Sequence, residues 1–147
     1  MATGYGRERQ GDLKWTNRNG NIYYILIKTA GRDDSHSDGE HHPYEPTDYG
    51  VLERLANSGY IGKKDTLVDY GSGKGRVSFF LAYQTRCQAI GVEYDRRLWE
   101  KALANGQTAA SRRRVTFVLA DAVEYEIQPL FAGDDDREKI LVLRLRD

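Results

Sequence analysis

The fold of this chain is decided by residues 66–76, which read Thr-Leu-Val-Asp-Tyr-Gly-Ser-Gly-Lys-Gly-Arg. The first five residues, Thr66–Tyr70, are β-rich and largely apolar, so they predict a short strand. The glycines that follow break this strand. A helical spacing then begins, formed by Val77, Phe80, Leu81 and Gln84. The stretch therefore predicts a strand, a glycine loop and a helix in that order.

The same alternation recurs along the rest of the chain. Gln88–Val92 predicts a second strand, and Val115–Leu119 and Ile140–Leu143 predict two more. A helix that Gly106 helps to end is indicated by Leu98, Trp99, Ala102 and Leu103. Strands that alternate with helices favour parallel pairing with right-handed crossovers. We therefore expect an α/β fold with a Rossmann-like, doubly wound and mostly parallel sheet.

The N-terminal part of the chain has a different character. Ile22–Ile27 predicts a strand between stretches that are rich in turn-forming residues. Thr47 is the expected N-cap of a helix that Gly59 ends, and the apolar positions of this helix are Val51, Leu52, Leu55 and Ala56. We expect an N-terminal arm with one strand over residues 1–43 and a Rossmann-like domain over residues 44–147.

Composition excludes several classes of protein. The chain has 147 residues and one Cys, and 22 Lys and Arg balance 22 Asp and Glu. No apolar run reaches the roughly 18 residues of a membrane span, and Met1–Gln10 lacks the apolar core of a secretory signal. The lone Cys87 fits a reducing compartment, so we expect a cytoplasmic protein. The zero net charge gives no global reason to expect nucleic-acid or membrane binding.

Three kinds of ligand loop compete for the glycine-rich run. A phosphate-binding P-loop would need Gly at position 68 and Ser or Thr at position 75, which are Val68 and Gly75 here. A dinucleotide fingerprint would need a glycine at position 76, and the chain has Arg76. An NAD site is therefore weakened but not eliminated. The third kind is Asp-x-Gly-x-Gly-x-Gly at the end of a strand, with Glu93 after the next strand.

These residues resemble the class I S-adenosylmethionine-dependent methyltransferases. Residues 68–75 look like the first motif of that family, Gly91–Asp95 like the second and Leu119–Ala122 like the third. The resemblance covers Tyr44 to about Tyr125 and is closest to small bacterial enzymes. A more general likeness exists to the non-SET histone lysine methyltransferases. The resemblance implies S-adenosyl-L-methionine as cofactor and makes residues 44–147 its binding domain.

The glycine loop is expected to hold the amino-acid tail of the cofactor. Glycines at Gly71, Gly73 and Gly75 let the main chain approach this tail without Cβ clashes. The N-terminus of the following helix favours its carboxylate, and Asp69 offers negative charge on the ammonium side.

The resemblance also implies how the nucleoside is held. Glu93 is expected to accept hydrogen bonds from the ribose hydroxyls, with Tyr94 beside it. Asp121 is expected to accept from the adenine amino group while the Ala122 amide donates to the ring. Asp121 alone could instead cap the turn after its strand. The full expected cofactor-binding set is Tyr44, Thr47, Asp69, Gly71, Gly73, Gly75, Glu93, Tyr94, Asp121 and Ala122.

Methyl transfer is a displacement on an activated methyl group, so positioning and exclusion of water do much of the work. Tyr44-Glu45-Pro46-Thr47 is similar to the cofactor-covering loop of some of these enzymes, which implies Tyr44 as a lid and Glu45 as a base. The expected methyl acceptor is a protein side chain or a small molecule. No metal site is expected, because the three histidines lack a recognised ligand spacing. Arg112–Arg114 is interpreted as a solvated loop.

The chain departs from the family pattern after Tyr125. The motif that normally ends the fourth strand, often Asn-Pro-Pro-Tyr, is absent, and later strands are missing. Two hypotheses therefore stand: a small methyltransferase, or a non-catalytic or truncated domain that binds the same cofactor. A short sheet would also leave an exposed edge that a second copy of the chain could cover, so a homo-oligomer is possible.

Overall fold

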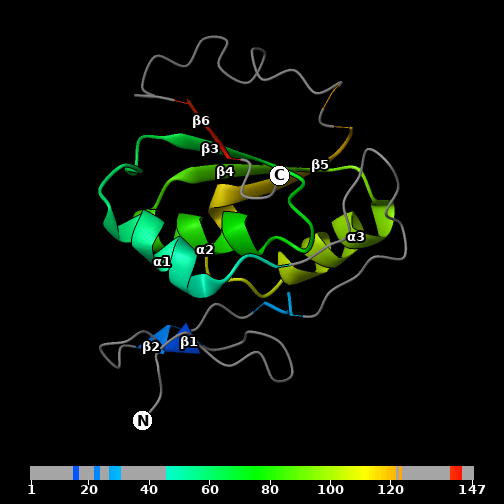
Figure 1. The fold of residues 1–147 in the computed structure, drawn as a ribbon. Helices are drawn as coiled ribbons and strands as arrows, with labels where there is room; N and C mark the ends of the chain where they lie inside the picture. The colour runs from blue at the N-terminus through cyan, green and yellow to red at the C-terminus, as the bar shows by residue number, and fades with distance from the viewer. Residues whose placement is uncertain are drawn as a thin grey trace.

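The computed structural model describes residues 15–16, 22–23, 27–30, 46–121, 123 and 140–143, the first two ranges and the last by their backbone alone. Four strands form one sheet in the order β5-β4-β3-β6, and every pairing is parallel (Figure 1). They are β3 (Thr66–Tyr70), β4 (Gln88–Glu93), β5 (Val115–Leu119) and β6 (Ile140–Leu143). All four strands predicted for this region are confirmed, and β4 is one residue longer than expected.

The strand order places a topological switch at β3. The chain moves outward from β3 through β4 to β5 and then returns to the other side of β3 with β6. In open α/β sheets, ligands bind outside the carboxyl ends of the strands at such a switch. The loop that follows β3 is the glycine loop, so the fold presents it at the expected position.

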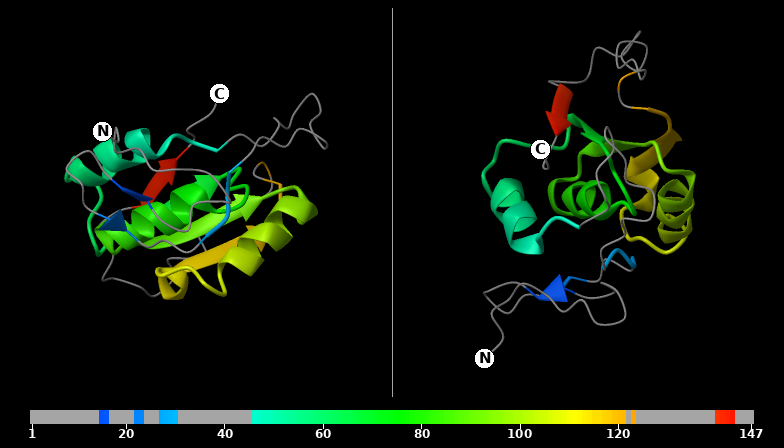
Figure 2. Two further views of the ribbon diagram at one scale, coloured as in Figure 1. Left: turned by 90° about the horizontal axis from the view of Figure 1, so that it is seen from below. Right: turned by 45° about the vertical axis from the view of Figure 1, so that its right-hand side comes forward.

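Three helices cover one face of this sheet: α1 (Tyr49–Asn57), α2 (Arg76–Thr85) and α3 (Arg96–Asn105). The right view of Figure 2 shows α2 between α1 and α3, with the strands above all three. A short 3-10 helix, η1 (Arg112–Arg114), leads into β5. Among the described residues, no helix is long and apolar enough to cross a membrane.

Helix α1 starts one residue later than the sequence suggested. The N-cap is Asp48, whose Oδ1 accepts a hydrogen bond from the Gly50 amide at 2.6 Å. The prediction of Thr47 as N-cap was therefore wrong, because two good capping residues stand side by side and the carboxylate caps the helix. The predicted stop at Gly59 is confirmed, since this residue has a φ of +80° just beyond the C-cap Ser58.

Helix α2 is buried on all sides over its first seven residues, Arg76–Ala82. The sequence predicted a single apolar face, but the sheet, α1 and residues near Ile27 enclose this helix. Its Phe79 packs edge-on against Phe117 of β5, and Phe80 packs against Tyr49 of α1. The outer helices behave as ordinary surface helices, and Val51 and Leu103, expected on their apolar faces, are exposed.

Two short strands, β1 (Trp15–Thr16) and β2 (Ile22–Tyr23), form a separate antiparallel pair. The predicted strand Ile22–Ile27 is therefore present at its start, and residues 24–26 lie outside the described residues. Ile27 itself is fully buried and belongs to the main hydrophobic core. Residues 27–30 thus pack against the α/β layers, on the side of the helices remote from the sheet (Figures 1 and 2).

Candidate functional site

The glycine loop connects the carboxyl end of β3 to α2 and has an unusual backbone. Gly71, Gly73 and Gly75 have φ angles of 75°, 57° and 98°, in the left-handed region that other residues rarely adopt. A Cβ at Gly75 would also lie 2.8 Å from both Phe79 and Phe117. The three glycines that the sequence singled out are therefore required by the conformation of the loop itself.

A fourth glycine, in the neighbouring strand β4, allows the loop to pack closely against that strand. A Cβ at Gly91 in β4 would lie 2.6 Å from Phe117 and 2.7 Å from Ser72 of the loop. Sequence reasoning quoted Gly91 as part of a motif but assigned it no role. A glycine inside a strand is a known signal of close approach by another segment, so this contact was open to prediction.

The amide groups of the loop are largely used inside the protein. Gly71 and Ser72 both donate to the Val92 carbonyl, at 2.8 and 3.1 Å, and Gly75 donates to the Ser72 carbonyl at 3.0 Å. The loop therefore offers a ligand close approach rather than a row of N–H donors. The N-terminus of α2 is different, because its N-cap, Gly75, supplies no side-chain acceptor. The first-turn amides of a helix favour an anion.

Glu93 joins the loop to the next strand. This carboxylate lies at the end of β4 and is only 7% exposed. Its Oε1 accepts from the Gly73 amide at 2.6 Å, and its Oε2 accepts from the Asp95 amide at 2.8 Å. A carboxylate only accepts hydrogen bonds, and each of its oxygens has two lone pairs, so its chemistry also suits the hydroxyl groups of a ligand. Glu93 thus fixes both turns that border the site.

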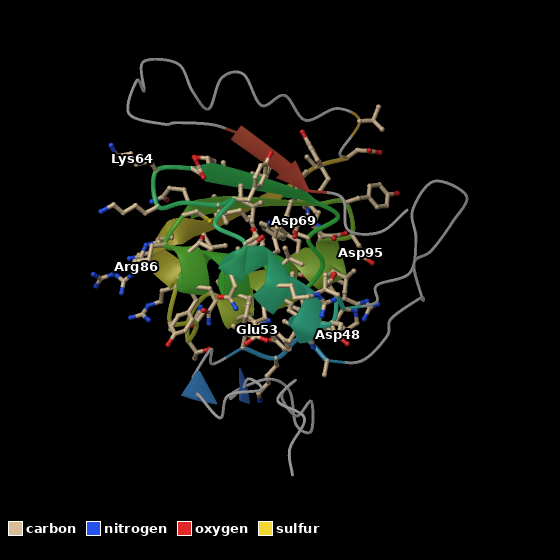
Figure 3. All side chains as sticks on the ribbon, turned by 60° about the vertical axis from the view of Figure 1, so that its left-hand side comes forward. Asp48, Glu53, Lys64, Asp69, Arg86 and Asp95 are labelled. Carbon is tan, nitrogen blue, oxygen red and sulfur yellow. The ribbon has the colours of Figure 1, made fainter. Side chains whose placement is uncertain are left out.

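The other predicted acids also lie at the carboxyl edge of the sheet. Asp69 is buried in β3, and Figure 3 shows it on the same side of the molecule as Asp95. Asp121 follows β5, and its Oδ1 accepts from the Val123 amide at 3.0 Å, which is the turn-capping role considered as the alternative. Tyr94, directly after β4, is 47% exposed. The fold brings these residues and the glycine loop together.

Three of the predicted site residues, Tyr44, Glu45 and Ala122, lie outside the described residues. Thr47 is described, and its carbonyl accepts from Arg76 Nη1 at 3.0 Å. This contact places Thr47 beside the start of α2 and therefore next to the glycine loop.

The two cations of the loop region bind protein groups. Lys74 Nζ donates to the Ala30 carbonyl at 3.2 Å. Arg76 is 2% exposed, and its Nε donates to Thr29 Oγ1 at 2.7 Å while its guanidinium lies 4.3 Å above the Tyr49 ring. The sequence analysis used Arg76 only as an argument against the dinucleotide fingerprint, and it did not predict this structural role. No local pattern could have signalled it, because Thr29 is 47 residues away.

Groups outside this edge do not extend the site. The Cys87 thiol is buried at the amino end of β4, and its burial raises its pKa. Arg112 and Arg113 are exposed, as expected of a solvated cluster, but residues 112–114 form the 3-10 helix η1 rather than a loop. Within the described part of the chain, no cluster of His, Cys, Asp and Glu could hold a metal ion. The three histidines lie outside that part.

No family model matches this chain. Ribosomal RNA small subunit methyltransferase A of Moorella thermoacetica is 31% identical over 86 residues, which are 58% of this chain and 28% of that protein. A protein-lysine N-methyltransferase of Saccharolobus islandicus is 30% identical over 88 residues, which are 59% of this chain and 55% of that protein. The chain thus spans little more than a quarter of the ribosomal RNA methyltransferase and little more than half of the protein-lysine methyltransferase.

Solved structures agree with this likeness. An RNA methyltransferase from Salinibacter ruber in complex with S-adenosyl-L-homocysteine superposes with a TM-score of 0.53 and 31% identity, over 56% of this chain and 54% of that one. The structure of YjhP from E. coli superposes with a TM-score of 0.51 at 18% identity, over 63% of this chain and 36% of that one, and shows the fold alone. The Rossmann-like α/β fold expected from the sequence is therefore confirmed.

Proposed function

We propose that this chain, which is similar in sequence and fold to the class I S-adenosylmethionine-dependent methyltransferases, binds S-adenosyl-L-methionine at the carboxyl edge of its sheet and transfers the methyl group to an acceptor. The observation that carries the proposal is the glycine loop at the strand switch, with three left-handed glycines and its centre bonded to Glu93. The Salinibacter structure, solved with S-adenosyl-L-homocysteine, supports the same cofactor.

The residues of this edge match the charges of the cofactor. In the proposed arrangement, the buried Asp69 faces the ammonium group of the amino-acid tail, and the α2 N-terminus receives its carboxylate. Glu93 accepts from the ribose hydroxyls. A hydrogen bond to a charged group contributes about 1.5 to 3 kcal/mol. Glu93 therefore accounts for a large share of the affinity.

The adenine end is assigned to residues that follow β4 and β5. We assign Tyr94 and the Ala122 amide to the ring, and Asp121 to its amino group. Thr47 closes the other side of the site through its contact with Arg76. These roles are proposals that rest on position at the carboxyl edge and on the family resemblance.

The bound cofactor supplies a sulfonium-activated methyl group. In the proposed transfer, an acceptor lone pair forms the new bond to the methyl carbon while the carbon–sulfur pair returns to sulfur, leaving S-adenosyl-L-homocysteine. Glu45 takes the proton that the acceptor loses, and Tyr44 covers the reacting groups. Both residues directly precede Pro46 and Thr47, and the Thr47 carbonyl is bound by Arg76 at the start of α2.

The acceptor we propose is a protein side chain or a small molecule. The two curated relatives act, by their names, on ribosomal RNA and on protein lysine, so they do not agree on one class of acceptor. A chain with no net charge lacks the overall attraction to phosphate that favours nucleic-acid binding. A cytoplasmic location and self-association through a sheet edge belong to the same proposal.

The alternative is a non-catalytic or truncated domain that binds the cofactor without transferring its methyl group. It is favoured by the missing fourth-strand motif and by the partial coverage of both relatives. An NAD site is disfavoured by Arg76, because its side chain is buried at the point where the fingerprint needs a glycine.

The test is calorimetric titration of the chain with S-adenosyl-L-methionine, S-adenosyl-L-homocysteine and NAD, with the mass in solution measured by light scattering. We expect micromolar binding of the two sulfur compounds and none of NAD. Methylation of a peptide or small-molecule library, followed by mass spectrometry, then separates the enzyme from the cofactor-binding domain. A folded chain that binds neither sulfur compound would refute the proposal.

A further inference from the structure

One segment far from the cofactor motifs is bonded to the glycine loop. In Ile27–Ala30, the side chains of Ile27 and Thr29 are fully buried, while Lys28 is exposed. This alternation is that of an extended strand lying on a core. The segment lies beneath the junction of α2 and α3, and its last residue, Ala30, precedes the first glycine of the loop, Gly71, by 41 residues (Figure 1).

Asn105, the last residue of α3, connects this segment to the loop. Its Oδ1 accepts from the Lys28 amide at 2.8 Å, and its Nδ2 donates to the Lys28 carbonyl at 3.1 Å. The same Nδ2 donates to the Lys74 carbonyl at 2.9 Å. A side-chain amide has two N–H donors and one carbonyl acceptor, and all are used here. Asn105 therefore pairs with Lys28 as a neighbouring strand would, and with the loop at the same time.

Two further bonds join the same partners directly. Lys74 Nζ donates to the Ala30 carbonyl, and Arg76 Nε donates to Thr29 Oγ1. Three consecutive residues of the segment, 28 to 30, are thus each bonded either to Asn105 or to the second half of the glycine loop. The first half of the loop is bonded elsewhere, to Val92 and Glu93 at the end of β4.

A loop with three glycines needs such restraints, because glycine loses more conformational freedom on ordering than any other residue. If a loop is not ordered beforehand, the ligand must order it, and its apparent affinity falls by the fraction of molecules in the binding conformation. We propose that Ile27–Ala30 is part of the cofactor-binding unit and that Asn105 is the positioning residue that holds the second half of the loop in its binding conformation. This inference rests on the proposed function.

The test compares two buried polar residues that differ in their contact with the loop. Asn105→Asp keeps the size of the side chain but places a carboxylate oxygen against the Lys28 and Lys74 carbonyls. Ser111→Ala, the matched control, removes a buried hydroxyl that donates to the Phe79 carbonyl within α2 at 2.8 Å. Both variants should lower the melting temperature, so titrations are made at a temperature where both are fully folded.

We expect the Kd for S-adenosyl-L-homocysteine to rise about tenfold in Asn105→Asp and less than about twofold in Ser111→Ala. Thr29→Val is the second variant, because it keeps the buried volume and removes the hydroxyl that accepts from Arg76. It should raise the Kd by a smaller factor. A purely structural role for Asn105 predicts that the Kd follows the melting temperature in all three variants, and that result would overturn the inference.

A measurement without ligand separates this inference from the proposed function. Hydrogen exchange of the amides in residues 71–76 should be faster in Asn105→Asp and Thr29→Val than in wild type, and unchanged in Ser111→Ala. If the wild type fails to bind either sulfur compound, the proposed function is refuted, and the exchange rates still test the restraint. Unchanged exchange in both loop-facing variants would refute the restraint, whatever the wild type binds.

Discussion

The two edges of the sheet differ in their charged residues, although the chain has a formal net charge of zero. In the described residues, the carboxyl edge holds five acids and four cations: Asp48, Asp69, Glu93, Asp95 and Asp121, with Lys74, Arg76, Arg96 and Arg97. The turns at the amino edge hold one acid, Asp65, and six cations: Lys63, Lys64, Arg86, Arg112, Arg113 and Arg114. Figure 3 shows Lys64 and Arg86 on the side away from Asp69 and Asp95. A net charge of zero over the whole chain therefore conceals a cationic amino edge and a carboxyl edge where acids and cations are mixed.

The glycine loop at the carboxyl edge combines a left-handed backbone with close packing. A substitution there should therefore have the largest effect on stability and binding. Gly75→Ala at the carboxyl edge forces a Cβ to within 2.8 Å of two phenylalanine rings at a φ of +98°. Strain and overpacking together should lower the free energy of unfolding by about 3 kcal/mol and abolish cofactor binding. Urea denaturation and titration with S-adenosyl-L-homocysteine measure the two effects.

The control lies at the end of α1. Gly59 also has a positive φ of +80°, but a Cβ there meets nothing within 4 Å. Gly59→Ala should therefore cost only the left-handed backbone term, about 1 kcal/mol, with normal binding. Equal losses of stability in the two variants would mean that packing behind the loop contributes nothing.

A pair of buried carboxylates sharpens the comparison. Glu93 Oε1 and Oε2 accept amides at the carboxyl edge, whereas Asp65 Oδ2 accepts the Gly62 amide at the amino edge at 2.6 Å. Glu93→Gln leaves one amide facing an NH2 group and removes the negative charge, so the Kd for S-adenosyl-L-homocysteine should rise at least about tenfold. Asp65→Asn should leave it unchanged, and calorimetry on both variants decides. Tight binding by Glu93→Gln would remove the ribose assignment.

The elements that sequence reasoning predicted correctly share one property, because their signals are local. Each strand is a short β-rich run, and the loop is recognised by three glycines within five residues. The contacts it missed join distant residues: Asn105 is 77 residues from Lys28 and 31 from Lys74. Nothing near Asn105 distinguishes it from an ordinary helix-ending residue. The error at Thr47 was of another kind, since two adjacent capping residues are locally equivalent and the sequence does not show which of them caps the helix.

Removing a single charge at either edge should change the Kd for the cofactor by a smaller factor. Asp95 caps α3 by accepting the Arg97 amide at 2.8 Å, and asparagine caps helices equally well, so Asp95→Asn changes charge with little change in structure. At an ionic strength of about 0.01 M, the Kd for S-adenosyl-L-methionine should rise about twofold, and the effect should fade near 0.15 M. Arg112→Gln at the amino edge should not raise it at either salt concentration. A salt-independent loss in Asp95→Asn would point to altered structure instead.

The smallest expected effect concerns the Cys87 thiol at the amino edge. Burial is the main cause that raises its pKa, and the Asp65 carboxylate acts in the same direction, while the Thr85 hydroxyl and Arg114 oppose them. A raised pKa in the folded state means that the thiol stays protonated after its unfolded counterpart ionises near pH 8.5. Stability from this group is thus complete below about pH 8.5 and is lost as pH rises toward the folded pKa.

Urea denaturation of wild type and Cys87→Ala between pH 7 and about pH 10 measures this loss. We expect the alanine variant to be less stable at pH 7, because it leaves a small cavity, and the difference to shrink as pH rises. Native Cys87 should also resist alkylation at pH 8, because little thiolate forms and the thiol is buried. A constant difference across this range, or rapid alkylation of the folded chain, would place the thiol in contact with solvent. The amino edge would then be open at β4, where the structure has it closed.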